Sequence, residues 1–99
     1  MLPKLAKGCT SVYHLYVIRS KRRNELQDYL TKKGIGTVVH YPVPPHLQEA
    51  YRDLGFKKGY FPLAENIADT CLSLPLYPGM TIDEVFVVSG VIKMFFNNA

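Results

Sequence analysis

A proline-rich stretch, Pro42-Val43-Pro44-Pro45, limits most strongly what this chain can fold into. Proline lacks a backbone N–H and has a fixed φ angle, so this stretch fits neither the interior of a helix nor the interior of a sheet. We therefore expect a long, stiff loop here. The loop divides the chain and fixes the positions of the polar residues that flank it, which are His40, Tyr41 and His46.

The residues before the loop predict a strand, a helix and a second strand. Residues 12–18 (VYHLYVI) are rich in β-branched and aromatic side chains and are apolar on both faces, which is typical of a strand covered on both sides. Apolar residues then recur at helical spacing and are followed by Gly34, so we expect a helix over residues 22–33. Residues 37–41 (TVVHY) predict the second strand.

The residues after the loop predict three helices and one more strand. We expect a short helix over residues 46–54 and a short strand over residues 72–76. A capping box, Thr81-Ile82-Asp83-Glu84, predicts the start of the last helix. Between the short helix and the strand we expect another helix, which begins at Pro62, a favoured first-turn residue. Its apolar stripe is made of Leu63, Ala64, Ile67, Ala68 and Cys71.

This order of elements predicts an α/β fold. We expect a single small sandwich of a mostly antiparallel, three- to four-stranded sheet with helices packed on it. A length of 99 residues suits one domain, and 47% hydrophobic residues is enough for a core. We assign residues 1–10 to an irregular lead-in, the remnant of a linker, and residues 11–99 to the domain.

The sequence favours a cytoplasmic location. It contains no run of about 18 apolar residues that would predict a membrane span. Residues 1–8 have no apolar segment after their lysines, so we expect no signal peptide. Two cysteines, Cys9 and Cys71, do not form a disulfide framework. We therefore expect a reduced protein that does not associate with membranes.

The formal net charge of +4 raises the question of a nucleic-acid partner. The basic residues are spread along the chain, and the densest run, residues 21–23, opens the predicted helix over residues 22–33. Lys32 and Lys33 close that helix, where cations suit the helix dipole. A solvated helix face explains this pattern better than a nucleic-acid patch, so we expect no nucleic-acid binding.

Three stretches in this order resemble one enzyme family. They are YHLYVIR (residues 13–19), GIGT leading to HYPVPPH (residues 34–46) and LPLYPGMT (residues 74–81). Together, with fitting intervals and over residues 11–96, they are similar to the C-terminal small domain of the DegT/DnrJ/EryC1/StrS family. Members of that family are pyridoxal-phosphate-dependent aminotransferases of fold type I that act on keto-sugars attached to nucleotides.

The resemblance implies a division of labour between two domains. In the family, a large domain binds pyridoxal phosphate and supplies the Schiff-base lysine, the small domain closes over the cleft, and the active site lies at a homodimer interface. The reaction would serve polysaccharide, cell-surface or antibiotic sugar biosynthesis. The large domain is missing here, and the lysines outside the lead-in lie in polar, helical or loop settings. We therefore expect no catalytic residue in this chain, no bound cofactor and no transamination by it alone.

The residues around the proline loop are the first candidates for substrate binding. With the resemblance, His40, Tyr41 and His46 are expected at the mouth of the cleft, where they would hydrogen-bond a sugar hydroxyl or a diphosphate. The alternative is that His40 and Tyr41 end a strand and pack locally. No companion cysteine or histidine has metal-ligand spacing, so we expect no metal site.

Three residues of the first strand are further possible substrate ligands. His14 and Tyr16 are two residues apart and so lie on one face of the predicted strand. They would face the cleft or fill the packed face of the sheet. Arg19 would meet a substrate phosphate or pair with a carboxylate.

Two questions stay open at the level of sequence. The chain could be a freestanding, non-catalytic interaction module derived from this family, and the full enzyme could be a dehydratase rather than an aminotransferase. A domain of this size that has lost the cover of its large domain is expected to expose an apolar patch beside residues 41–46 and to self-associate through it, whereas a clean monomer would favour the freestanding module.

Overall fold

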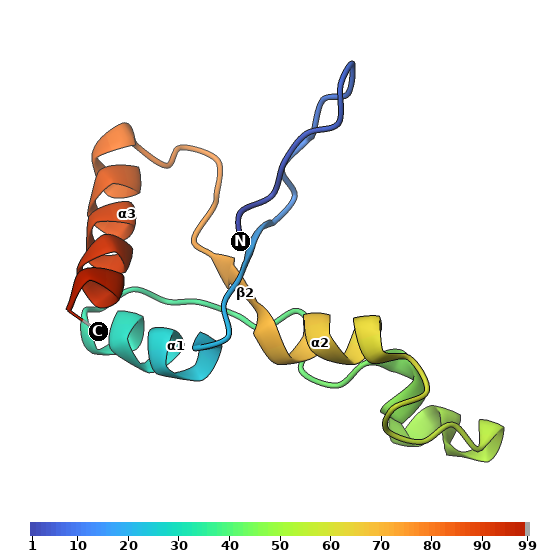
Figure 1. The fold of residues 1–99 in the computed structure, drawn as a ribbon. Coiled ribbons are helices and arrows are strands. Elements are labelled where there is room, and N and C mark those ends of the chain that lie inside the picture. Colours follow the sequence, from blue (N-terminus) through green and yellow to red (C-terminus); the bar gives the residue numbers. More distant parts are fainter. Residues whose placement is uncertain (99) are drawn as a thin grey trace.

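The computed structural model describes residues 1–98 (Figure 1). A two-stranded sheet lies at the centre, helices α1 and α3 lie to one side of it, and helix α2 extends away on the other side. Two short 3₁₀ helices, η1 and η2, come next after α1 in the chain, and Pro45 is the first residue of η1. The elements in chain order are β1 (Tyr16–Arg19), α1 (Arg23–Lys32), η1 (Pro45–Leu47), η2 (Glu49–Leu54), α2 (Pro62–Thr70), β2 (Cys71–Leu74) and α3 (Ile82–Asn97).

The sheet is antiparallel and joins two strands that are far apart in sequence. Tyr16 lies opposite Leu74, and Arg19 lies opposite Cys71. Because side chains alternate along a strand, this register places Tyr16 and Ile18 on the same face as their partners Leu74 and Leu72. That face looks toward α3 and forms the sheet side of the hydrophobic core.

The core lies between this sheet face and helices α1 and α3. Leu26 and Leu30 of α1, four residues apart on one helical face, are fully buried, as is Leu72 of β2. Ile35, together with Val91 and Phe95 of α3, completes the cluster. The ring of Phe95 packs against Tyr29 at a centroid distance of 5.4 Å. The apolar residues that recur at helical spacing in the first predicted helix are therefore the side of α1 that packs against the sheet and α3.

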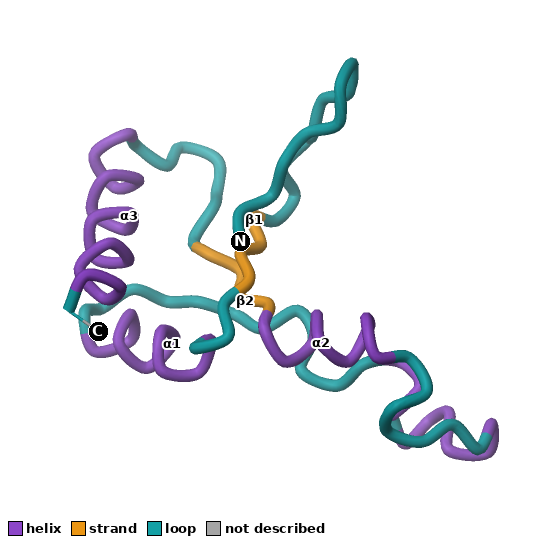
Figure 2. The backbone as a smooth tube through the Cα atoms, in the orientation of Figure 1, coloured by secondary structure: helices purple, strands orange, loops and turns teal. Residues whose placement is uncertain are grey.

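The proline-rich arm, residues 42–61, extends away from this core (Figure 2). It contains η1 and η2 and returns to the start of α2. Gln48 between the two 3₁₀ helices is extended, with φ −72° and ψ 142°, so the predicted single helix over residues 46–54 is wrong. Three prolines in four residues and this extended residue divide the segment into two short 3₁₀ helices.

The predicted α/β class is confirmed, but the sheet is smaller than expected. In place of a strand over residues 37–41, the described residues show one bridge, in which the N–H of Val38 donates to Ser73 O and the N–H of Ser73 donates to Val38 O. The ladder does not continue to His40, because the backbone of Cys71, its next partner, is already bonded: its N–H donates to Ile67 O and its carbonyl accepts from Arg23 Nη1. The strand predicted over residues 72–76 begins one residue earlier, at Cys71, and ends two residues earlier, at Leu74.

The first strand begins at Tyr16 rather than at residue 12. Residues 1–15 run outward and return beside β1 (Figure 1), and Tyr13 has a positive φ of 47°, which interrupts extended structure. The N–H of Arg19 donates to Met1 O at 2.9 Å, and the Met1 amino group donates to Arg19 O at 2.8 Å. The lead-in is irregular, as expected, but its first residue lies alongside the sheet.

The helix ends follow the local signals closely. The capping box is present: the Glu84 N–H donates to Thr81 Oγ1, and the Thr81 N–H donates to Glu84 Oε2. Gly34 takes a left-handed conformation with φ 78° just after α1, a role that suits glycine. Pro62 is the first residue of α2. Within residues 1–98, no helix combines the length and the hydropathy needed to cross a membrane.

Candidate functional site

His40 and Tyr41 lie together at the start of the proline-rich arm. The Nδ1 atom of His40 is 2.8 Å from the Oγ of buried Ser73, which belongs to β2. The His40 ring meets Tyr41 edge-on at a centroid distance of 5.3 Å. Tyr41 itself is 70% exposed. The sheet thus holds His40, and His40 supports an exposed tyrosine.

His46 occupies a different environment within the arm. Its side chain is 6% exposed, and its Nε2 atom is 3.2 Å from Oε2 of Glu65, which lies in the first turn of α2. Phe61 packs edge-on against the imidazole at 4.9 Å. His46 therefore connects η1 to α2.

Glu65 receives several hydrogen bonds at the point where the arm returns to α2. The N–H of Gly59 donates to both carboxylate oxygens at 2.9 Å, and the N–H of Phe61 donates to Oε2 at 3.3 Å. The Gly59 N–H, followed by the bonds from His46 and Phe61, lowers the pKa of Glu65 below its ordinary value, although burial acts in the opposite direction. The carboxylate is thus the group that closes the arm.

The trio expected around the proline loop is only partly brought together. His40 and Tyr41 are neighbours, and Tyr41 lines a hollow with Val43 and Leu47. His46 lines a separate apolar hollow of about 240 Å³ with Tyr51 and Phe56. The arm thus presents an exposed tyrosine at one place and a buried histidine at another.

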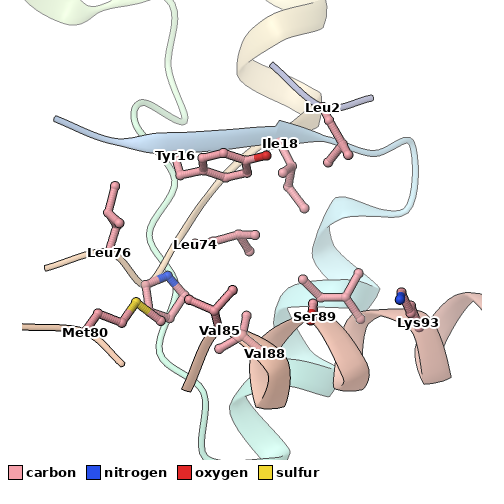
Figure 3. A pocket seen from close by; sticks show the side chains of 12 residues that line it. Leu2, Tyr16, Ile18, Leu74, Leu76, Met80, Val85, Val88, Ser89 and Lys93 are labelled. Atoms are coloured by element: carbon pink, nitrogen blue, oxygen red, sulfur yellow. The ribbon is translucent and has the colours of Figure 1, made fainter. Parts of the chain in front are cut away.

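Tyr16 and His14 differ in their surroundings. Tyr16 lies in β1 and lines an apolar groove of about 400 Å³ between the sheet and α3 (Figure 3). His14 precedes the strand and is exposed, so it does not share a strand face with Tyr16 as predicted. The groove is lined mostly by aliphatic side chains, which are Leu2, Ile18, Leu74, Leu76, Val85, Val88 and Ile92.

Arg19 bonds neutral partners at the C-terminal end of α2. Its Nε donates to Thr70 Oγ1 at 3.0 Å, and its Nη2 donates to Asn66 Oδ1. The carboxylate partner considered from the sequence is not among these contacts. Arg19 also lines a hollow with Lys21 and Arg22. The end of a helix carries partial negative charge, which accounts for a guanidinium placed there.

Sequence reasoning missed two polar residues that shape the site, Ser73 and Glu65. Each lies next to a histidine that is distant in sequence, 33 and 19 residues away. The sequence offered a weak signal for each: Ser73 is a polar residue in an otherwise apolar strand, and Glu65 lies in the first turn of a predicted helix. A buried polar residue needs a partner, so such positions are worth pairing with nearby histidines.

The lysines of this chain do not suit a pyridoxal phosphate site. A Schiff-base lysine works from a desolvated pocket. All eight lysines are exposed here, those at positions 4, 7, 21, 32, 33, 57, 58 and 93. The part of the chain that the structure describes also brings together no group of three or more potential metal ligands.

Comparison with known proteins identifies the family. Residues 1–93 match the profile of the DegT/DnrJ/EryC1/StrS aminotransferase family. The chain belongs to this family. It corresponds to the family's C-terminal small domain, as the three motifs predict.

Characterised relatives are considerably longer than this chain. It is 41% identical over 92 residues to the erythromycin biosynthesis sensory transduction protein EryC1 of Saccharopolyspora erythraea, and this match covers 93% of the chain and 25% of the relative. It is 44% identical over 92 residues to the dTDP-3-amino-3,4,6-trideoxy-alpha-D-glucose transaminase of Streptomyces venezuelae, covering 93% and 24%. The chain spans about a quarter of the length of such relatives.

Solved structures agree with the fold. The S. venezuelae protein DesV in complex with a ketimine intermediate superposes with a TM-score of 0.91 at 37% identity, covering 95% of this chain and 25% of that one. A DegT DnrJ EryC1 StrS aminotransferase from Brucella abortus gives a TM-score of 0.86 at 34% identity, covering 95% and 25%. Nearly the whole chain thus shares the fold of about a quarter of these aminotransferases.

Proposed function

We propose that this chain serves as the small domain of a pyridoxal-phosphate-dependent aminotransferase that acts on a nucleotide-linked keto-sugar. The observation that carries the proposal is the match over residues 1–93 to a family of sugar aminotransferases, together with the close structural likeness to DesV. Amino transfer to a sugar, rather than dehydration, is favoured by the transaminase names of relatives such as the S. venezuelae enzyme.

The small domain contributes substrate contacts and closure over the cleft, while a separate large domain holds the cofactor. Bound pyridoxal phosphate supplies an electron sink for the amino-transfer chemistry. The exposure of every lysine in this chain supports the assignment of the Schiff-base lysine to the large domain. The complete enzyme is a homodimer in this proposal.

Tyr41 is the residue of the trio best placed to touch a substrate. Its ring is exposed, and its orientation is set by His40, which the sheet holds through Ser73. A phenol hydroxyl can donate to or accept from a sugar hydroxyl or a diphosphate oxygen. His46 contributes indirectly in this scheme, because its bond to Glu65 sets the path of the arm that follows Tyr41.

The test is a chimera in which this chain replaces the corresponding quarter of the S. venezuelae transaminase. Loss of a contact made equally to substrate and transition state raises KM and leaves kcat unchanged. We expect Tyr41→Ala to raise KM for the nucleotide sugar about 10-fold, with little change in KM for the amino donor. Steady-state kinetics with each substrate varied in turn measures both constants.

Two controls make the result specific. Tyr51→Ala removes another half-exposed tyrosine from the same arm and is expected to leave both KM values unchanged. Visible absorbance of bound cofactor reports whether the chimera has assembled. An assembled chimera without amino transfer contradicts the proposed function, and equal KM changes for both substrates contradict the role of Tyr41. Borohydride trapping of cofactor on one specific lysine of the chain alone would contradict the assignment of that lysine to the large domain.

A further inference from the structure

Helix α3 carries more apolar surface than its own chain covers. Val91 and Phe95 are buried in the core, yet Ile82, Phe86 and Val87 are 69%, 68% and 60% exposed. A helix that is apolar on all sides is normally covered on all sides. In Figure 1, α3 stands at the edge of the molecule with one side facing away from the sheet and α1.

The uncovered side forms a continuous strip, which we call the outer face of α3. At 3.6 residues per turn its members fall within roughly 140° of the helix circumference. Most of them are exposed, and Gly90 is partly exposed. The outer face consists of Ile82, Asp83, Phe86, Val87, Gly90, Lys93 and Met94.

Gly90 is the least expected member of this face. Glycine in a helix interior destabilises the helix relative to alanine, because it loses more backbone freedom on folding. A Cβ atom added at Gly90 would meet nothing within 4 Å, so the fold of the chain itself does not require a glycine there. A bulky side chain of a partner packed directly onto the helix backbone at this position would require one.

The charges of the outer face are complementary to those of the outer face of a second α3 helix that runs antiparallel to it. Asp83 and Lys93 form no ion pair within residues 1–98. They are ten residues apart, roughly 15 Å along the helix. Two antiparallel α3 helices can be paired so that their two-fold axis lies at the level of Val88 along each helix. Asp83 then lies opposite Lys93 of the other copy, and Phe86 lies opposite its Gly90.

We propose that the outer face of α3 binds a second copy of this chain in this antiparallel arrangement. The contact is isologous, so each copy supplies Phe86 to the space above the other copy's Gly90. One Asp83–Lys93 pair between the copies lies at each end of the interface. This goes beyond the proposed function, because it requires neither a large domain nor a substrate. It also differs from the patch beside residues 41–46 that the sequence indicated for self-association.

Sedimentation equilibrium of the 99-residue chain over rising concentration tests the proposal. We expect a monomer–dimer equilibrium whose Kd rises at least ~10-fold in Phe86→Glu and in Gly90→Met, because both changes affect the centre of the interface. Leu63→Glu is the matched control, since Leu63 is 69% exposed on α2. It is expected to dimerise like the unaltered chain.

Gly90→Met also separates dimer loss from misfolding. Methionine is a better helix former than glycine and its Cβ has open space in the monomer, so helix content by circular dichroism is expected to stay the same or rise. A chain that remains monomeric at high concentration overturns the proposal. So does dissociation by Leu63→Glu with no effect of Phe86→Glu or Gly90→Met, because it moves the contact to another surface.

A charge exchange tests the antiparallel register. Lys93→Asp alone is expected to raise Kd, because it places two carboxylates opposite each other at each end of the interface. Combining it with Asp83→Lys restores opposite charges and is expected to recover dimerisation. If the double variant dimerises no better than Lys93→Asp, the register is wrong.

Discussion

The apolar core and the proline-rich arm are held together by different contacts. In the core, Leu26, Leu30 and Leu72 are completely buried. From residue 49 to residue 63, every side chain is exposed. The arm is closed instead by the polar contacts of Glu65 and by edge-on packing among Phe56, Phe61 and His46.

The difference implies that the two regions lose structure under different conditions. Burial of apolar side chains stabilises the whole domain cooperatively and depends little on pH. A few hydrogen bonds to one carboxylate stabilise only the segment they close, and they require the charged form. We therefore expect the arm to open locally while the core stays folded, and the following experiments test that separation.

The largest expected effect is loss of the core through Leu72→Ala. Removing a fully buried leucine side chain costs its transfer free energy and leaves a cavity, about 2–5 kcal/mol in comparable proteins. Because small domains are stable by only about 5–15 kcal/mol, the whole chain should approach unfolding. Urea denaturation followed by circular dichroism measures the change.

Leu63→Ala is the matched control for the core variant. Leu63 is 69% exposed, and its loss is expected to change the free energy of unfolding by less than about 0.5 kcal/mol. Equal destabilisation by both variants would mean that the apolar contacts of the core do not dominate the stability of the chain.

A smaller and more local effect is expected from acid. The pKa of Glu65 is lowered in the folded arm, chiefly by the Gly59 N–H, so the carboxylate form stabilises the closed arm. That contribution is present above the ordinary glutamate pKa of about 4.3 and is lost as pH falls through the lower folded value. The amide resonances of Gly59 and Phe61 should therefore shift in acid before those of Leu26 and Leu30.

Glu65→Gln provides the comparison for the acid experiment. A neutral amide keeps the size of the side chain and removes the titration, so the arm resonances should no longer depend on pH in this range. If arm and core amides change together in the unaltered chain, the two regions form one cooperative unit and the separation fails.

The smallest expected effect concerns the start of α3. Thr81→Ala removes the hydroxyl that accepts the Glu84 N–H and is expected to cost about 1 kcal/mol. Thr81→Ser keeps an acceptor and should be close to neutral. Amide exchange in the first turn of α3 measures the loss. A change spread over the core amides instead would show that the free end of α3 is coupled to the core.

The sequence predicted the features that depend on neighbouring residues. Gly34 marked the C-terminal end of α1, and the capping box marked the start of α3. Pro62 marked the first residue of α2. The strand at residues 37–41 was wrong because strand pairing is non-local, and only Val38 finds a partner in Ser73. Propensity alone does not report where a partner strand ends.

The candidate site was predicted less completely for a related reason. The sequence singled out His40, Tyr41 and His46 but not the groups that set their orientation. Ser73 and Glu65 reach the two histidines only through the tertiary fold. The exposure of Tyr41 and the burial of His46 could not be read from residues that flank the same prolines.

The direct junction between α2 and β2 has a mechanical consequence. Thr70 ends the helix and Cys71 begins the strand, with no residue between them. Arg23 Nη1 donates to the carbonyls of Ala68 and Cys71 at 3.0 and 2.9 Å, so the joint is fastened on both sides. A helix joined in this way cannot swing independently of its strand. A push on the far end of α2 is therefore transmitted as a torque on the sheet.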